Sequence, residues 1–147
     1  MFNETPSGGS THGATLDILA RARPALLKAL AETLLEGVGE ISVITNRTGL
    51  VMVPMRDTVE NVDFHLGEVL VSEAHIADAA GYVGYGMVTG RDLERAMAMA
   101  VVDLRLAATG EQPAITTFLA EERAHQAAED TARMRQVEAT RVEMETF

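Results

Sequence analysis

The sequence contains no cysteine, which excludes disulfides, thiolate catalysis, zinc–thiolate sites and iron–sulfur ligation by this chain. It also has few basic residues. The sequence contains 12 Lys and Arg residues and 22 Asp and Glu residues, which gives a formal charge of −10 and a pI near 4.8. Such a surface repels a phosphate backbone, so we expect no nucleic-acid partner. Metal chemistry would need His and carboxylates, or a partner.

The sequence shows neither a transmembrane segment nor an export signal. We therefore expect no membrane partner and a cytoplasmic location. Residues 1–14 are polar and rich in Gly, Ser and Thr, which predicts a flexible leader. With 147 residues, of which 47% are hydrophobic, the rest of the chain suits one core. We predict a single α+β domain over residues 15–147.

The first half of this domain alternates between helical and strand patterns. A helical pattern begins at Thr15, and Pro24 interrupts it and starts a second helix that Gly37 and Gly39 end. Short runs rich in Val, Ile and Met follow, and Pro54 predicts that its strand lies at a sheet edge or ends there. The expected fold has an antiparallel four-stranded meander with a turn at residues 46–49, its strands spanning residues 40–46, 49–56, 64–77 and 82–88.

Two further helices are expected. Asp92 is a suitable N-cap for a central helix whose apolar stripe packs on the sheet, and Gly110 ends that helix. The long C-terminal helix, about residues 114–145, is rich in charge and has few large apolar residues. A helix with so little surface to bury is marginal alone, so we expect it to dock on a partner.

Glu68 and the run Gly90-Arg91-Asp92 are the residues that could carry chemistry. Strand alternation places Glu68 on one face with Phe64, Leu66 and Leu70. The simpler interpretation is a strand edge or a structural pair with an Arg, and the alternative is an interface or site carboxylate. The Gly90 run joins a strand to a helix, where backbone donors and an Arg can hold an anion. The simpler interpretation is a turn followed by a helix cap.

Other chemical motifs are missing. The four histidines are scattered without the spacing of a metal site, and Ser72 and Thr89 lack the flanking glycines of a nucleophile elbow. Gly81, Gly84 and Gly86 do not match either nucleotide-binding fingerprint, and we expect them to serve close packing or a bulge. The motifs of this chain alone therefore do not indicate a complete enzyme.

Several short runs nevertheless follow one another in a particular order: Thr48 to Met52, Phe64 with Leu66 to Val69, Ser72 to Ala74, Gly81 with Gly84 to Gly86, Gly90 to Asp92, Val102-Asp103 and Ala139 to Glu143. This order resembles the PhnG family, the small G subunit of the bacterial carbon–phosphorus lyase system. Two departures stand out. The usual aromatic pair and basic tail are absent after Glu143, and Glu73 stands where a basic residue is common.

The resemblance implies an accessory subunit of a core complex with the H, I and J subunits. That complex displaces adenine from ATP with a phosphonate such as methylphosphonate. ATP is then a substrate of the complex, and the iron–sulfur cluster and S-adenosylmethionine belong to a partner, so this chain is expected to bind no cofactor and no metal. No catalytic residue carries over. The candidate interface or motif residues are Glu68, Gly90, Arg91, Asp92 and Arg141.

Two other interpretations stay open. The chain could be a small acidic α+β ligand-binding protein or enzyme that uses Glu68 and Arg91 directly. It could also be a self-sufficient homo-oligomer, and an isolated subunit can form a homodimer because orphaned partner surface self-associates.

Overall fold

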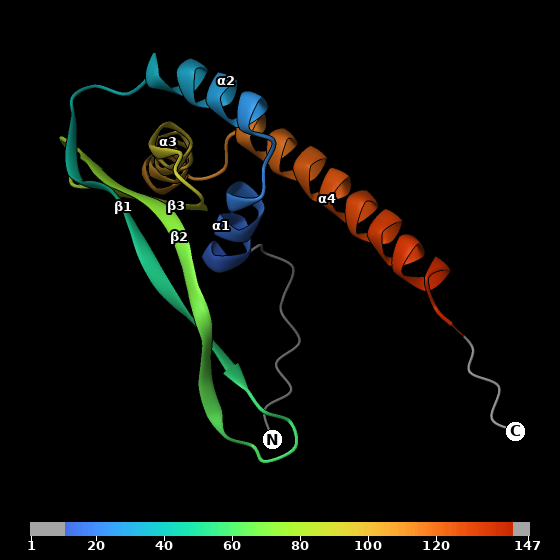
Figure 1. Cartoon of the computed structure of the whole chain (residues 1–147). Coiled ribbons are helices and arrows are strands. Elements are labelled where there is room, and N and C mark those ends of the chain that lie inside the picture. Colours follow the sequence, from blue (N-terminus) through green and yellow to red (C-terminus); the bar gives the residue numbers. More distant parts are fainter. Residues whose placement is uncertain (1–10, 143–147) are drawn as a thin grey trace, which may run out of the picture.

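The computed structural model describes residues 11–142 and contains four helices and one sheet in that range (Figure 1). Most of the segment predicted as a leader lies outside the described residues. In chain order the elements are α1 His12–Ala20, α2 Pro24–Leu35, β1 Ile41–Arg56, β2 Asp63–Asp78, β3 Val83–Thr89, α3 Leu93–Thr109 and α4 Pro113–Ala139. The first helix begins before Thr15, because the Thr11 hydroxyl accepts a hydrogen bond from the Ala14 backbone N–H and caps it.

The sheet has three antiparallel strands in the order β1-β2-β3, so the prediction of four strands is wrong. The two short strands expected at residues 40–46 and 49–56 are one continuous strand, β1. The residues predicted as a turn between them pair with β2 instead: Asn46 lies opposite Ala74, and Gly49 lies opposite Val71.

Long-range pairing explains why no turn forms at residues 46–49. Their composition favours a turn, but β2 offers a partner strand that is itself 16 residues long. The Arg47 side chain is 2.9 Å from the Glu73 carboxylate directly across the ladder. Such cross-strand pairs stabilise a sheet and here hold residues 46–49 in the extended conformation.

A register shift near Pro54 changes which side chains share a face. The strand does not end at Pro54, which lies on the edge strand β1 as predicted. Met52 pairs with Glu68 and Met55 pairs with Phe64, while Leu66 is the extra residue on β2. Because Met52 and Met55 are three residues apart, their partners Glu68 and Phe64 point to opposite faces. The prediction of one row containing Phe64 and Glu68 is therefore wrong.

Helix α3 packs directly on the sheet, as its apolar stripe predicts. The close approach requires glycine on β3. A Cβ built at Gly84 would lie 2.1 Å from the Ala100 carbonyl oxygen, and one at Gly86 would lie 2.1 Å from that of Ala96. The core lies between this helix, the sheet and α2, and it includes Leu27, Leu34, Ile76, Val88, Met99, Val102, Leu104 and Ile115.

Two arginines of α3 hold the ends of the other helices. Arg95 donates to the backbone carbonyl of Ala20 at 2.7 Å, where α1 ends. Arg105 donates to the carbonyl of Gly37 at 3.2 Å, just after α2. Cations at helix C-termini bind the carbonyl groups that have no partner within the helix. These bonds fix α1 and α2 around α3.

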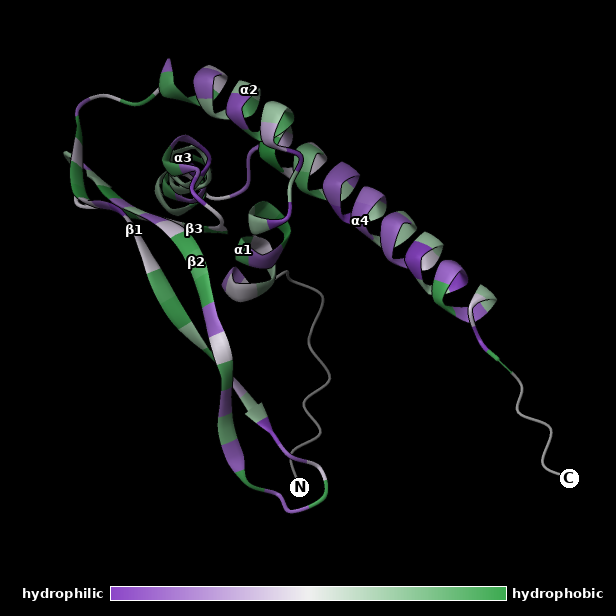
Figure 2. Cartoon of the chain, in the orientation of Figure 1, coloured by the Kyte–Doolittle hydropathy of each residue, from purple (hydrophilic) through white to green (hydrophobic). Residues whose placement is uncertain are grey.

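Two elements extend away from this body (Figure 1). Strand β3 pairs only with residues 71–77 of β2, so residues 50–70 form a two-stranded ribbon that we call the arm. Apolar residues run along both of its strands (Figure 2). Its exposed large apolar residues are Leu50, Val51, Met52, Met55, Val59, Val62, Phe64, Leu66 and Val69. The second element is the end of α4, whose residues 127–139 are all exposed.

Candidate functional site

The run Gly90-Arg91-Asp92 forms a tight junction between the sheet and α3. Gly90 has φ +90°, a conformation that favours glycine, and its N–H donates to the Leu70 carbonyl at 2.8 Å. The Asp92 carboxylate accepts from the Arg95 N–H at 3.0 Å and caps α3. Both residues therefore have the structural roles of turn and cap.

Ser72 completes this junction from within β2. Its side chain is fully buried; the hydroxyl donates to the Gly90 carbonyl at 2.8 Å and accepts from the Asp92 N–H at 2.9 Å. Sequence reasoning rejected Ser72 as a nucleophile and otherwise named it only in the family resemblance, so it missed this role. The sequence contained a signal for a buried Ser72, since strand alternation places this residue on the same face as the apolar Ala74 and Ile76, which are buried.

Arg91 and Glu68 are the two candidate residues whose side chains the fold does not use. Both side chains are exposed, and neither side chain makes a hydrogen bond or ion pair within residues 11–142. Glu68 lies on the arm, two residues before Leu70 in the sequence. The Leu70 carbonyl accepts the hydrogen bond from Gly90 that ties the junction to β2. The structure thus places Glu68 near the base of the arm without joining it to Arg91.

Arg141 lies apart from the other candidates. It follows α4, its side chain is 72% exposed, and it pairs with Glu138 at 3.1 Å. The sequence-predicted residues therefore do not form one site. They occupy the sheet–helix junction, the arm and the end of α4.

A polar cluster on the sheet face opposite α3 was not predicted. The Glu73 carboxylate accepts from Arg47 and, at 2.9 Å, from the Tyr85 hydroxyl, while the His75 ring lies edge-on to Tyr85. The hydrogen bonds from Arg47 and Tyr85 lower the pKa of Glu73. Burial and the Glu73 carboxylate raise the pKa of Tyr85 to about 12, so this hydroxyl stays a donor at neutral pH.

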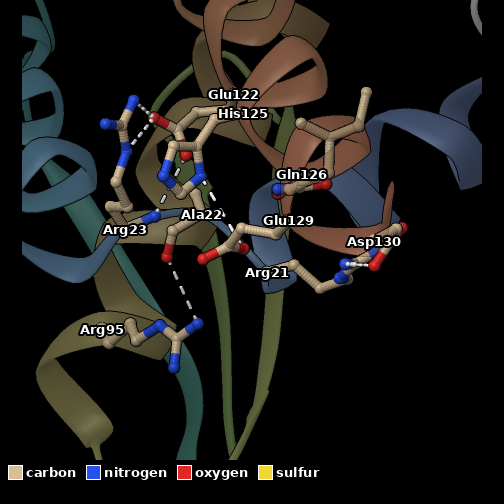
Figure 3. Close-up of polar contacts among 10 residues, drawn as sticks. Arg21, Ala22, Arg23, Arg95, Glu122, His125, Gln126, Glu129 and Asp130 are labelled. Atoms are coloured by element: carbon tan, nitrogen blue, oxygen red, sulfur yellow. Dashed lines mark hydrogen bonds and ion pairs between the residues drawn. The ribbon is translucent and has the colours of Figure 1, made fainter. Parts of the chain in front are cut away.

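The first half of α4 is held to the body by polar contacts with the segment between α1 and α2 (Figure 3). Glu122 is 1% exposed, and Arg23 donates to it from its guanidinium at 2.7 Å and from its backbone N–H at 3.2 Å. Burial acts to raise the pKa of Glu122, but the hydrogen bonds and charge of Arg23 outweigh it and lower that pKa. Gln126 donates to the Ile18 carbonyl, and Arg21 pairs with Asp130.

Asp103 is a buried carboxylate that ties three elements together. It is 4% exposed on α3, accepts from the Tyr85 backbone N–H of β3 at 2.9 Å, and lies 2.7 Å from the His12 ring at the start of α1. One oxygen thus satisfies an edge N–H of β3. The sequence signal was a lone acidic residue between the apolar Val102 and Leu104.

Neither a metal site nor a membrane span is found in the described part of the chain. Residues 11–142 contain no group of three His, Cys, Asp or Glu side chains arranged to hold a metal ion. In the same range, no helix combines the length and the apolar character needed to cross a membrane.

Comparison with known proteins decides the family. The model of a family described as "Phosphonate metabolism protein PhnG" matches residues 11–147. The chain belongs to the PhnG family. A relative from Rhizobium meliloti (strain 1021), alpha-D-ribose 1-methylphosphonate 5-triphosphate synthase subunit PhnG, is 31% identical over 131 residues, which cover 88% of this chain and 83% of the relative.

The structure gives physical roles to residues that carry the PhnG resemblance. Gly84 and Gly86 let α3 approach β3, Ser72 and Gly90 lock the sheet to that helix, and Asp103 binds the edge of β3. Glu73 has Arg47 and Tyr85 as local partners. These residues support the scaffold, and Glu68 and Arg91 remain candidates for contacts outside this chain.

Proposed function

We propose that this chain is an accessory, non-catalytic subunit of an α-D-ribose 1-methylphosphonate 5-triphosphate synthase that acts in phosphonate metabolism. In that reaction a phosphonate oxygen bonds to ribose C1 of ATP while the C1–N bond to adenine breaks, and adenine leaves. The proposed partners are the H, I and J subunits of the carbon–phosphorus lyase core complex in the cytoplasm. The iron–sulfur cluster and S-adenosylmethionine are proposed to belong to the J subunit.

Family membership supports the pathway, and one structural observation supports the accessory role. The ordered motif at the β3–α3 junction is occupied by structural bonds: Gly90 makes the turn, Asp92 caps α3, and Ser72 of β2 binds both. The arm, in contrast, exposes nine large apolar side chains along one two-stranded ribbon, which is the type of surface that binds other proteins.

The test is reconstitution with and without this chain. The H, I and J subunits would be purified with and without it, and adenine release from ATP and methylphosphonate would be followed. We expect turnover only when this chain is present, and none from this chain alone. Full turnover by the isolated chain, or unchanged turnover on its omission, would refute the proposal.

Two substitutions distinguish the accessory role from the alternative in which Glu68 and Arg91 take part directly in binding or catalysis. Glu68→Ala and Arg91→Ala would each be scored for complex assembly and for adenine release, with Glu111→Ala in the α3–α4 connection as a control. An accessory role predicts that any lost activity follows lost assembly. A fully assembled complex without turnover would instead support a direct chemical role.

A further inference from the structure

The arm is apolar on both faces. Leu50 and Met52, on the face that carries Glu68, are 63% and 60% exposed. Met55 and Phe64, on the opposite face, are 46% and 45% exposed. An ordinary surface hairpin buries one face and solvates the other with polar side chains. The arm does neither.

A ribbon of this kind needs an external layer. Two strands alone are marginally stable in water, and a strand apolar on both sides is typical of the interior of a fold. No helix within residues 11–142 covers either face, since α1, α2, α3 and the start of α4 gather around the other end of the sheet and the rest of α4 projects away from it (Figure 1). The described part of the chain therefore leaves both faces of the arm open to another chain.

The charges on the arm indicate the chemistry of that chain. Among residues 50–70 there is one basic residue, Arg56, against four acidic ones, which gives a net charge of −3. Asp63 pairs with Arg56 at 2.8 Å, and Asp57 accepts from the Val59 N–H within the tip loop. Glu68 has no such partner in the described chain and lies directly across from Met52. A carboxylate covered there would need a cation.

We propose that the arm inserts into a different subunit of the complex, which covers both faces with apolar side chains and pairs a Lys or Arg with Glu68. A second copy of this chain is a poor occupant, because it would bring an equally acidic arm on a chain of charge −10. This inference rests on the proposed function, since it takes the subunits of the synthase complex as the source of the partner.

The first test compares two charge reversals of equal size. Affinity for the purified H, I and J subunits would be measured for Glu68→Lys and for Glu111→Lys, which lies in the α3–α4 connection. We expect Glu68→Lys to bind at least about tenfold more weakly, because it sets two cations against each other. Glu111→Lys should bind like the wild type. Equal binding by both variants would overturn the proposal.

The second test compares two aromatic side chains at opposite ends of β2. Phe64 on the arm is 45% exposed, and Tyr82 in the β2–β3 turn is 46% exposed. Phe64→Ser is expected to weaken assembly at least about tenfold while leaving the thermal unfolding of the isolated chain unchanged, since this side chain lies outside the core. Tyr82→Ser should assemble normally. Normal assembly of Phe64→Ser would contradict an inserted arm.

Site-specific crosslinking identifies the occupant. A benzoylphenylalanine placed at position 52 of this chain in the reconstituted complex should form an adduct with the mass of one other subunit. An adduct between two copies of this chain, or none, would overturn the proposal. Failure of the proposed function is seen separately, as adenine release that continues when the whole chain is omitted. Arm variants that assemble normally in a complex that still requires the chain would refute this inference alone.

Discussion

At the scale of single residues, Ser72 connects two parts of the fold through one side chain. Its buried hydroxyl makes two hydrogen bonds that connect β2 to the turn before α3. We predict that Ser72→Ala lowers the free energy of unfolding by about 1–3 kcal/mol, because the Gly90 carbonyl and the Asp92 N–H lose their partner. Denaturant unfolding measures this loss. Ser42→Ala on the exposed part of β1 serves as the control and should change stability by less than about 0.5 kcal/mol.

Glu122 makes the stability depend on pH. Its pKa is lowered from 4.5 in the folded state because Arg23 binds the carboxylate. A lowered folded pKa stabilises the protein above the unfolded pKa, and this contribution is lost as pH falls through the folded pKa. We predict that Glu122→Gln costs about 1.5–3 kcal/mol at neutral pH, the range for hydrogen bonds to charged groups.

The measurement is a pair of unfolding curves across a pH series. The difference between wild type and Glu122→Gln should be constant above pH about 5 and should shrink as the solution becomes more acidic. Glu121→Gln, an exposed neighbour on the same helix, should show neither the loss nor the pH dependence. A difference that stays constant down to the lowest pH would show that the carboxylate charge of Glu122 is not what stabilises the contact.

At the scale of elements, the contact between α3 and β3 depends on glycine. We predict that Gly86→Ala destabilises the protein at the upper end of about 1–3 kcal/mol, because the new methyl group meets the Ala96 carbonyl and α3 must move away from the sheet. Gly49→Ala on β1 is the matched control, since nothing lies within 4 Å of its added Cβ. Thermal unfolding of both variants tests the prediction, and equal melting temperatures would contradict it.

The elements also show where sequence reasoning succeeds and where it stops. The helix starts at Pro24 and Asp92 and the helix stop at Gly110 could be predicted, because caps and breakers act within a few residues. The division of β1 into two strands was wrong, because pairing with β2 overrides a turn-like composition at residues 46–49. Pairing partners are distant in sequence and leave no local pattern.

The candidate site was limited in the same way. Gly90 and Asp92 could be assigned from composition, and the structure gives both the roles of the simpler interpretation. The face of Phe64 relative to Glu68 could not be assigned in the same way, because the register shift near Pro54 lies between these two residues and reverses the alternation that the prediction relied on. Arg47, Glu73 and Tyr85 come together only through strand register. The functional roles of Glu68, Arg91 and Arg141 stay predictions.

At the scale of the whole molecule, one compact body carries two projections of different chemistry. The arm is apolar and acidic, whereas the end of α4 mixes charges and exposes only Met134 and Val137 as large apolar residues of the helix. The low apolar content of α4 could be read from the sequence. The exposure of the arm could not, because its residues have the composition of a buried strand.

Helix α4 therefore divides into a part that stabilises the body and a part that does not. Its buried residues are Ile115, Phe118, Glu122 and Gln126, and every residue from 127 to 142 is exposed. We predict that truncation after Asp130 changes the free energy of unfolding by less than about 0.5 kcal/mol, because it removes no buried side chain and keeps the Arg21–Asp130 pair. Denaturant unfolding of the isolated chain gives this value.

A second truncation, after Glu121, is the comparison. It removes Glu122 and Gln126 and so leaves Arg23 and the Ile18 carbonyl without partners, which we expect to destabilise the body by at least about 2 kcal/mol. If the truncation after Asp130 keeps the stability of the body but weakens binding to the H, I and J subunits, the exposed half of α4 is a second docking element beside the arm. Unchanged binding would leave the arm as the principal contact, because the end of α4 would then serve neither the fold nor the complex.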